Sequence, residues 1–187
     1  MHDLKLKEKE YELVTLTQQH IQTLYDWNIE EKHLQYYTCR PLKQSHSFEE
    51  YTCNIINSIS DGKVKIYVLV KCGEYNTLLG KISLFDHNPR NHSAEFGYYL
   101  PDYNRSKGLG GILLNKFIGM SFENDELNLN KIYATTSSNN YPSISLLERY
   151  GFKLEGRLRE HYWIDEKRYD QLIYSILKSE FKSIIQC

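Results

Sequence analysis

Basic residues and glycines stand close together in one short stretch of the sequence. We call this stretch the glycine loop; it consists of Arg105, Ser106, Lys107, Gly108, Leu109, Gly110 and Gly111. Apolar residues at helical spacing follow it, so the loop is expected at the N-terminus of a helix. Backbone N–H groups at such a place, together with the helix dipole and basic side chains, bind an anion such as a pyrophosphate. A solvated, glycine-rich helix start is the structural alternative.

The spacing of these glycines excludes two common nucleotide-binding loops. A Walker-type phosphate loop needs the pattern GxxxxGK[ST], and a dinucleotide-binding loop needs GxGxxG. Neither pattern occurs around Gly108. The glycine loop is therefore not expected to bind a nucleoside triphosphate or a dinucleotide.

Hydrophobic periodicity indicates which elements position this loop. Strands are predicted at 11–16, 65–72, 78–86, 93–100, 131–136, 152–159 and 168–178. Helices are predicted at 18–28, 48–60, 109–120 and 142–150. The stretch 29–46 has no clear pattern. This order predicts a single α/β domain with a mixed central sheet flanked by helices.

Several local features are expected within these elements. Ser47 and Glu50 have the form of a capping box at the start of the second helix. Three apolar residues of that helix are expected in the core: Ile55, Ile56 and Ile59. Residues 73–77 are expected to form a hairpin loop, and the charged run 30–33 a solvated helix end.

The glycine loop resembles a motif of a known family. Residues 105–110 are similar to the [RQ]xxGx[GA] coenzyme A loop of the GCN5-related N-acetyltransferases (GNAT), and residues 94–100 to the fourth strand of that family. A second block, 140–152, resembles the NxxSxxxLExxGF segment of the RimJ/RimL-type ribosomal-protein acetyltransferases, and 156–177 resembles their closing strands. The resemblance covers residues 9–182.

The resemblance implies acetyl-CoA as acyl donor and a splayed pair of fourth and fifth strands. It assigns cofactor binding to the glycine loop and to the end of the fourth strand, at Tyr98, Tyr99 and Leu100. It also assigns cofactor binding to Asn140 and Ser143, and to Ser143 a hydrogen bond or proton for the leaving thiolate. An N-cap and helix-start pair before Pro142 is the structural alternative. Many members of the superfamily have a tyrosine that acts as general acid at the position of Leu147. Leucine cannot donate a proton, so this role is excluded at that position.

Glu95 is the candidate general base, acting directly or through water. An amine of pKa near 10 must lose a proton before it attacks a thioester. Alternation places Glu95 on the same side of the predicted strand as Tyr99. A carboxylate in an apolar strand is costly unless it is used or paired. A hydrogen-bonded structural glutamate is the alternative.

The expected function is N-acetylation of a primary amine in a ternary complex. The acceptor is either the α-amine of a protein, by analogy with ribosomal proteins, or a small amine such as a polyamine or an aminoglycoside-like antibiotic. A third alternative is an acyl-CoA sensor without turnover. Three of the 16 tyrosines are candidates for the acceptor wall: Tyr36, Tyr37 and Tyr162.

Composition excludes several other classes. The net charge of −1 gives no global field for nucleic acid, and no apolar stretch is long enough for a membrane span or a signal peptide. The seven histidines and four cysteines show no metal-ligand spacing, so no metal is expected; His161 lies near the expected acceptor region. We expect a cytoplasmic protein, for which a homodimer is compatible with the sequence.

Overall fold

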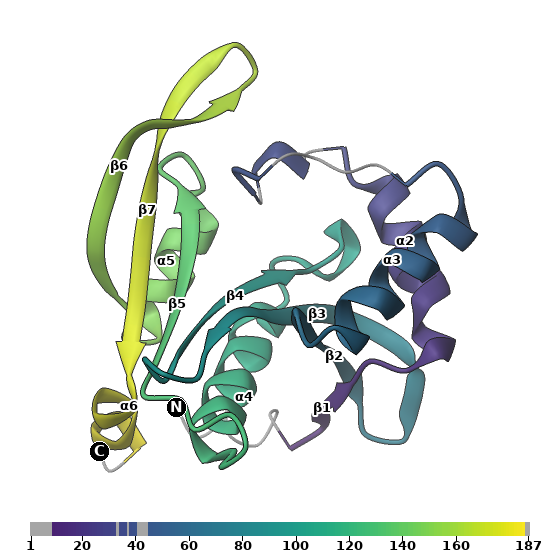
Figure 1. Cartoon of the computed structure of the whole chain (residues 1–187), viewed down its shortest axis with the longest axis horizontal. Coiled ribbons are helices and arrows are strands. Elements are labelled where there is room, and N and C mark those ends of the chain that lie inside the picture. The colour runs from purple at the N-terminus through teal and green to yellow at the C-terminus, as the bar shows by residue number, and fades with distance from the viewer. Residues whose placement is uncertain (1–8, 33, 37, 41–44, 186–187) are drawn as a thin grey trace. The chain divides into compact units, whose positions relative to one another are not determined.

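The helices and strands follow the order that the sequence predicts, with one further helix at the end (Figure 1). The computed structural model describes residues 9–32, 34–36, 38–40 and 45–185. The strands are β1 (Tyr11–Thr15), β2 (Val64–Lys71), β3 (Glu74–Asn88), β4 (Ser93–Tyr99), β5 (Lys131–Ser137), β6 (Lys153–Ile164) and β7 (Lys167–Leu177). The α-helices are α2 (Ile21–Glu30), α3 (Phe48–Ser60), α4 (Leu109–Glu123), α5 (Tyr141–Arg149) and α6 (Lys178–Ile185). Short 3₁₀ turns are η1 (Gln18–His20), η2 (Leu34–Tyr36) and η3 (Asp102–Asn104).

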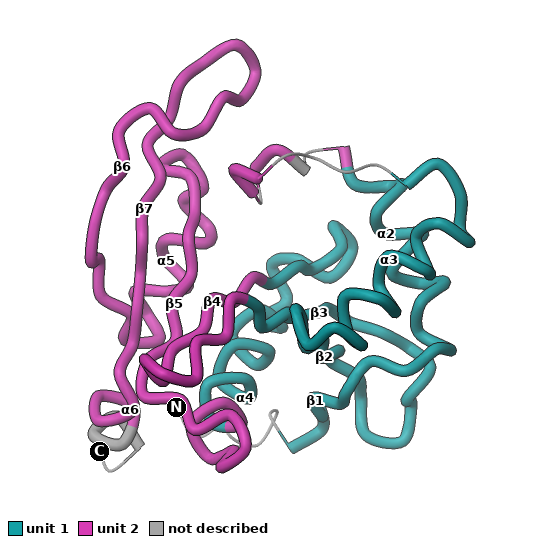
Figure 2. Tube along the Cα trace, in the orientation of Figure 1, with its two compact units in different colours: residues 1–31, 45–85, 98–119 teal, residues 32–44, 86–97, 120–187 magenta. Residues whose placement is uncertain are grey.

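The strands form a mixed sheet, as the element order predicts. Their order in the sheet is β1-β2-β3-β4-β5-β7-β6. The pair β4 and β5 is parallel, with Ser93–Glu95 opposite Lys131–Tyr133, whereas β5 and β7 are antiparallel along the whole of β5. The chain divides into two compact units, shown in Figure 2: unit 1 is 1–31, 45–85 and 98–119, and unit 2 is 32–44, 86–97 and 120–187. Among the described residues, no helix is long and apolar enough to cross a membrane.

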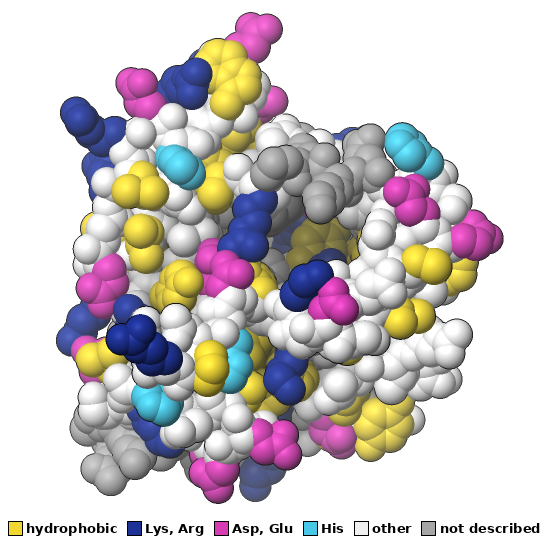
Figure 3. All heavy atoms as spheres, in the orientation of Figure 1, with side chains coloured by type: hydrophobic (Ala, Val, Ile, Leu, Met, Phe, Trp, Pro, Cys, Tyr) yellow, Lys and Arg dark blue, Asp and Glu magenta, His cyan; other side chains and the backbone are white. Residues whose placement is uncertain are grey.

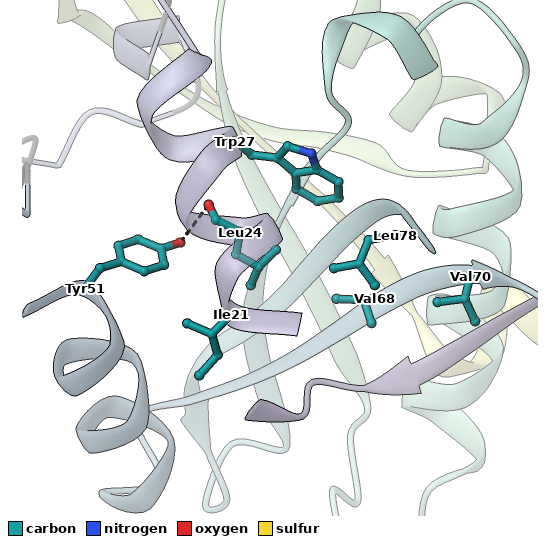
Figure 4. Packing of buried hydrophobic residues seen from close by; sticks show 7 residues of the cluster. All are labelled: Ile21, Leu24, Trp27, Tyr51, Val68, Val70 and Leu78. Carbon is teal, nitrogen blue, oxygen red and sulfur yellow. Dashed lines mark hydrogen bonds between the residues drawn. The ribbon is translucent and has the colours of Figure 1, made fainter. Parts of the chain in front are cut away.

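Unit 1 has its core where α2 and α3 pack on β2 and β3 (Figure 4). Helical spacing places Ile21, Leu24 and Trp27 on one side of α2, where all three are buried. They meet Val68 and Val70 of β2, which are fully buried. A polar contact fits into this apolar core, because the hydroxyl of Tyr51 donates to the Leu24 carbonyl at 3.2 Å.

Helix α3 is capped as predicted but exposes more of its apolar residues than expected. The Ser47 hydroxyl accepts from the Glu50 N–H at 3.1 Å, and the Glu50 carboxylate accepts from the His46 N–H at 2.7 Å rather than closing the box on Ser47. The expectation that three isoleucines are core is wrong for two of them. Ile56 and Ile59 are 42% and 38% exposed, because the buried side of α3 is the one that carries Tyr51.

Two hairpins differ from the sequence prediction. Strand β3 begins at Glu74, opposite Lys71, so the predicted five-residue loop 73–77 is wrong. The turn is short because Gly73 adopts a φ of 83°, and the extra residues lie in irregularities of β3 opposite Leu69–Lys71. Strand β6 continues past the predicted end at 159, because a two-residue turn with positive φ at Asp165 and Glu166 joins it to β7.

Unit 2 is built on β5, β7 and β6, with α5 beside β5 in Figure 1. The pairing of β6 with β7 is interrupted between Leu158 and Tyr162 by a bulge. The Asp170 carboxylate holds this bulge, because it accepts from the Glu160 N–H at 2.8 Å and pairs with Arg157. The bulge thereby places Tyr162 with its side chain buried, at 2% exposure.

Leu24 and Ile56 give a test of this core. Leu24→Ala is expected to lower the free energy of unfolding by about 2–5 kcal/mol, because it leaves a cavity under α2. Ile56→Ala, with the side chain already 42% exposed, is expected to cost less than about 1 kcal/mol. Urea unfolding followed by circular dichroism measures both values. Equal losses would contradict the packing of α3 described above.

Candidate functional site

The glycine loop leads into α4 through two residues with left-handed backbone. Ser106 and Gly108 have φ of 60° and 80°, and both are exposed together with Lys107. A Cβ built on Gly108 would meet no atom within 4 Å, so the space beside this backbone is open. Helix α4 begins at Leu109, and the first N–H groups of a helix have no acceptor within it. The loop thus has the backbone features of an anion site that its sequence predicts.

The members of the loop differ in what they can offer a ligand. Leu109 is 6% exposed, so only its backbone can reach a bound molecule. The N–H groups of Gly111 and Ile112 already donate to the Gly108 carbonyl, at 3.1 and 3.3 Å. The N–H groups of Leu109 and Gly110 therefore stand at the start of the helix dipole, and Lys107, which precedes them in the loop, is exposed.

The charge of Arg105 is already compensated inside unit 1. Its guanidinium donates to the Glu31 carboxylate at 2.7 Å, pairs with Asp102, and donates to the Leu100 carbonyl at 2.9 Å. The Glu31 side chain is only 3% exposed, so the expectation of a solvated helix end is wrong at this residue. Arg105 ties the loop to the ends of α2 and β4, and Lys107 is the exposed cation of the loop.

The end of β4 carries an aromatic ring surrounded by two cations. The ring of Tyr99 lies 5.8 Å from that of Trp27, and Arg105 and Lys81 lie 5.7 and 5.9 Å from its centroid. Burial lowers the pKa of Lys81 to about 8. Tyr98, Tyr99 and Leu100, to which the resemblance assigns the cofactor, are all partly exposed.

A close backbone approach shapes this end of β4. A Cβ built on Gly80 would lie 2.5 Å from Cδ2 of Leu100 and 3.1 Å from the carbonyl oxygen of Tyr99. A side chain on Gly80 would therefore require the Leu100 side chain to turn aside and the Tyr99 carbonyl to shift by a few tenths of an ångström. Gly80 thus allows a close approach to the end of β4.

Glu95 lies in unit 2 and is buried, with 8% of its surface exposed. It stands opposite Tyr133 at the last parallel pair of β4 and β5. Its carboxylate accepts from the Thr135 hydroxyl at 3.0 Å and from Arg40 at 3.1 Å. Burial raises the pKa of the Glu95 carboxyl; Thr135 and Arg40 oppose this rise, and the charge of Asp86 adds to it. A carboxyl with a raised pKa suits proton transfer at neutral pH.

Three residues that were not predicted complete the surroundings of Glu95. Arg40 donates to Asp86 at 2.6 Å as well as to Glu95, and Asp86 holds a left-handed φ of 51° at the end of β3. Thr135 follows Tyr133 on the same side of β5, so the parallel register brings it to Glu95. Alternation along β5 places Thr135 on the side of Tyr133, but its contact with Glu95 depends on a register that the sequence does not give. Arg40 lies in the stretch 29–46, where the sequence shows no pattern.

Tyr162 is the buried tyrosine of the expected acceptor wall. None of the described residues forms a hydrogen bond of good geometry with its hydroxyl. Burial raises the pKa of Tyr162 well above its usual range, and Cys39 and Glu95 nearby raise it further. The hydroxyl is therefore a proton donor at neutral pH. The Cys39 thiol in turn accepts from Gln171 at 3.3 Å.

Tyr36 and His161, also expected near the acceptor, lie at the β6–β7 turn and in the β6 bulge. Tyr36 donates to Asp165 at 2.7 Å, at the turn between β6 and β7. His161 is exposed in the β6 bulge. Tyr37 lies outside the described residues, so its assignment stays a prediction. Among the described residues, no group of three or more His, Cys, Asp or Glu side chains is arranged to hold a metal ion.

Asn140 and Ser143 form the start of α5. The Asn140 side chain accepts from the Ser143 N–H at 3.3 Å, so the helix-start arrangement named as the structural alternative is present. Its amide N–H₂ group is a donor that this contact does not use. Leu147, at the place of the superfamily tyrosine, is fully buried. Three residues predicted for catalysis or cofactor binding thus lie in unit 2. Glu95 contacts Thr135 and Arg40, which were not predicted, and Asn140 contacts Ser143.

Comparison with known proteins extends these observations. The family model described as Acetyltransferase (GNAT) domain matches residues 13–173. YdaF of Bacillus subtilis (strain 168), provisionally named a ribosomal N-acetyltransferase, is 33% identical over 106 residues, which are 57% of this chain and 57% of that protein. The chain therefore spans less than two thirds of the length of this curated relative.

Solved structures share the fold. Spermidine N-acetyltransferase from Vibrio cholerae, in complex with CoA and spermine, has a TM-score of 0.82 and 25% identity, over 93% of this chain and 99% of that one. RimL, a ribosomal L7/L12 alpha-N-protein acetyltransferase in complex with coenzyme A, has a TM-score of 0.77 over 90% and 94% of the two chains; at 20% identity it shows the fold alone. Because the family model matches most of its length, the chain belongs to the GNAT acetyltransferase family.

Proposed function

We propose that the chain transfers the acetyl group of acetyl-CoA to a primary amine, by direct attack in a ternary complex. The observation that carries this proposal is the buried Glu95 carboxylate at the last parallel pair of β4 and β5, in a chain of the GNAT family. A buried carboxylate with a raised pKa is a suitable base for an ammonium acceptor. This observation favours an enzyme over an acyl-CoA sensor.

Coenzyme A would be held mainly by backbone groups. The N–H groups of Leu109 and Gly110, with the ammonium of Lys107, would bind the pyrophosphate. The open space beside Gly108 leaves room for a phosphate. Backbone groups of Tyr98, Tyr99 and Leu100 would bind the pantetheine and the thioester carbonyl. Arg105, Ser106 and Gly111 would shape the loop, and Asn140 and Ser143 would bind the cofactor near its sulfur.

The residues of the chain would take one proton from the acceptor and stabilise the leaving thiolate. Acetyl-CoA supplies a thioester carbonyl that a neutral amine can attack. The Glu95 carboxylate accepts the proton of the acceptor ammonium, directly or through water. The neutral amine then forms the C–N bond while the C–S bond breaks, and the proton that the attacking nitrogen loses goes to the leaving thiolate or to water. A hydrogen bond from Ser143 would stabilise the leaving thiolate. A thiol with a pKa near 8.5 leaves without a strong acid, which fits the presence of Leu147 instead of tyrosine.

For the acceptor we propose the α-amine of a protein N-terminus, as in the RimJ/RimL-type branch, with residues 9–182 as the catalytic domain. The sequence block 140–152 and the likeness to YdaF support this assignment. A polyamine or another small amine is the second candidate, supported by the likeness to the spermidine acetyltransferase of Vibrio cholerae.

A cytoplasmic location is part of this proposal. Cys39, Cys53 and Cys72 are all free thiols, as in proteins of reducing compartments. On the face drawn in Figure 3, basic and acidic side chains are interspersed without a large area of one sign. This arrangement offers no surface for a nucleic-acid partner on that face.

Turnover with acetyl-CoA tests the proposed reaction and its base. Thiol release is measured with peptides that carry a free N-terminus and with spermidine, and intact mass identifies the acetylated acceptor. We expect Glu95→Gln to lower kcat at least about 100-fold and to remove the acidic limb of the pH profile, because glutamine cannot accept a proton. No thiol release with any amine would contradict an acetyltransferase. An unchanged pH profile of Glu95→Gln would remove Glu95 from the mechanism.

The glycine loop offers a matched pair of variants. Gly108 and Gly62 both have left-handed φ, 80° and 68°, and a Cβ would meet no atom within 4 Å at either one. Alanine should therefore lower the free energy of unfolding by a similar amount at both positions, about 1 kcal/mol. We expect only Gly108→Ala to weaken CoA binding, at least about tenfold in isothermal titration, because its methyl group occupies the space for the phosphate. Equal CoA affinities for the two variants would contradict the site.

A further inference from the structure

Arg40 lies between two carboxylates in unit 2. Its guanidinium donates to Asp86 at 2.6 Å and to Glu95 at 3.1 Å. The side chains of Arg40 and Asp86 are 53% and 54% exposed, whereas that of Glu95 is 11% exposed. A single arginine therefore links a buried carboxylate to an exposed one.

The charge of this cluster follows from its members. Among the described residues, Arg40 and Asp86 are the charged side chains that act on the Glu95 carboxyl. Thr135 is neutral, and Tyr133 and Tyr162, both of which feel the charge of Glu95, have raised pKa values and stay protonated. Cys39 accepts a hydrogen bond from Gln171. One guanidinium and two carboxylates leave the ionised cluster with one negative charge, which a single ammonium group balances.

We propose that Arg40 makes the acceptor site selective for an amine that carries one positive charge and disfavours polycations. This inference rests on the proposed function, with Glu95 as the group that receives the ammonium proton. A second ammonium near the cluster would have to compete with Arg40 for Asp86, or lie beside a guanidinium of the same sign. Without Arg40, the two carboxylates would carry two negative charges and would fit a dication.

Acceptors that differ by one charge test the proposal. We compare Ser-Ala-Ala amide with Lys-Ala-Ala amide, and butylamine with 1,4-diaminobutane, by kcat/KM at pH 8. In Arg40→Gln, the ratio of kcat/KM for the dication to that for the monocation is expected to rise about two- to fivefold, the size of one partly exposed ion pair. The change should lie mainly in the KM of the dication. An unchanged ratio would overturn the proposal.

Three further variants separate the local charge of Arg40 from its side-chain shape and from the net charge of the chain. Arg40→Lys keeps the positive charge and should keep the ratio of the wild type. Arg149→Gln removes an exposed arginine from α5, and the ratio should again stay constant. A rise of equal size in Arg149→Gln would show an effect of net charge alone and would also overturn the proposal. Asp86→Asn brings the cluster to zero charge and should lower the ratio, so the test does not depend on the folding of Arg40→Gln.

The pH profile gives a second readout that a purely structural role would not move. Arg40 lowers the pKa of the Glu95 carboxyl, and Asp86 raises it. Arg40→Gln should therefore move the acidic limb of kcat/KM to higher pH, and Asp86→Asn should move it to lower pH. Shifts of the same sign would contradict the roles of both residues. Failure of the wild type to acetylate any of the four amines would instead contradict the proposed function.

Discussion

The parallel pairing of β4 with β5 at Ser93–Glu95 is the contact on which the candidate chemistry depends. It brings Glu95 opposite Tyr133 and within reach of the Thr135 hydroxyl. Beyond these pairs, β5 continues to Ser137 with β7 as its partner. Backbone polar groups that leave a ladder need other partners. In GNAT proteins the backbone groups that the two strands leave unpaired bind the cofactor. The short pairing of β4 with β5 would therefore supply the backbone groups that the proposed reaction needs.

A buried carboxylate at this position is tolerated because its surroundings offset the cost of burial. Removal of a carboxylate from water is unfavourable, and this raises the pKa of Glu95. One hydroxyl and one guanidinium stabilise the ionised form in return. The pKa of the Glu95 carboxyl is thus set by opposing contributions rather than by burial alone. Such a balance can bring the pKa of a catalytic base into the range that its reaction needs. The same principle applies in unit 1, where Glu31 is buried but paired with Arg105.

The sequence predicts the parts of the site that depend on local patterns. The glycine loop, the N-cap at Asn140 and the strand that carries Glu95 are local patterns of glycine, polar and apolar residues, and the structure confirms each of them. Arg40, Asp86 and Thr135 are missed because their contacts with Glu95 join residues far apart in the chain. The compensation of Arg105 by Glu31 is missed for the same reason. The exposure of Ile56 depends on which side of α3 packs, and helical spacing alone does not decide this.

We propose that this chain of the GNAT family binds coenzyme A at the glycine loop for acetyl transfer. Hydrogen–deuterium exchange with and without CoA measures this directly at single amides. We expect CoA to slow exchange at Leu109 and Gly110, whose N–H groups stand at the start of α4. Saturating CoA that leaves these amides unchanged, while it protects other parts of the chain, would contradict the claim.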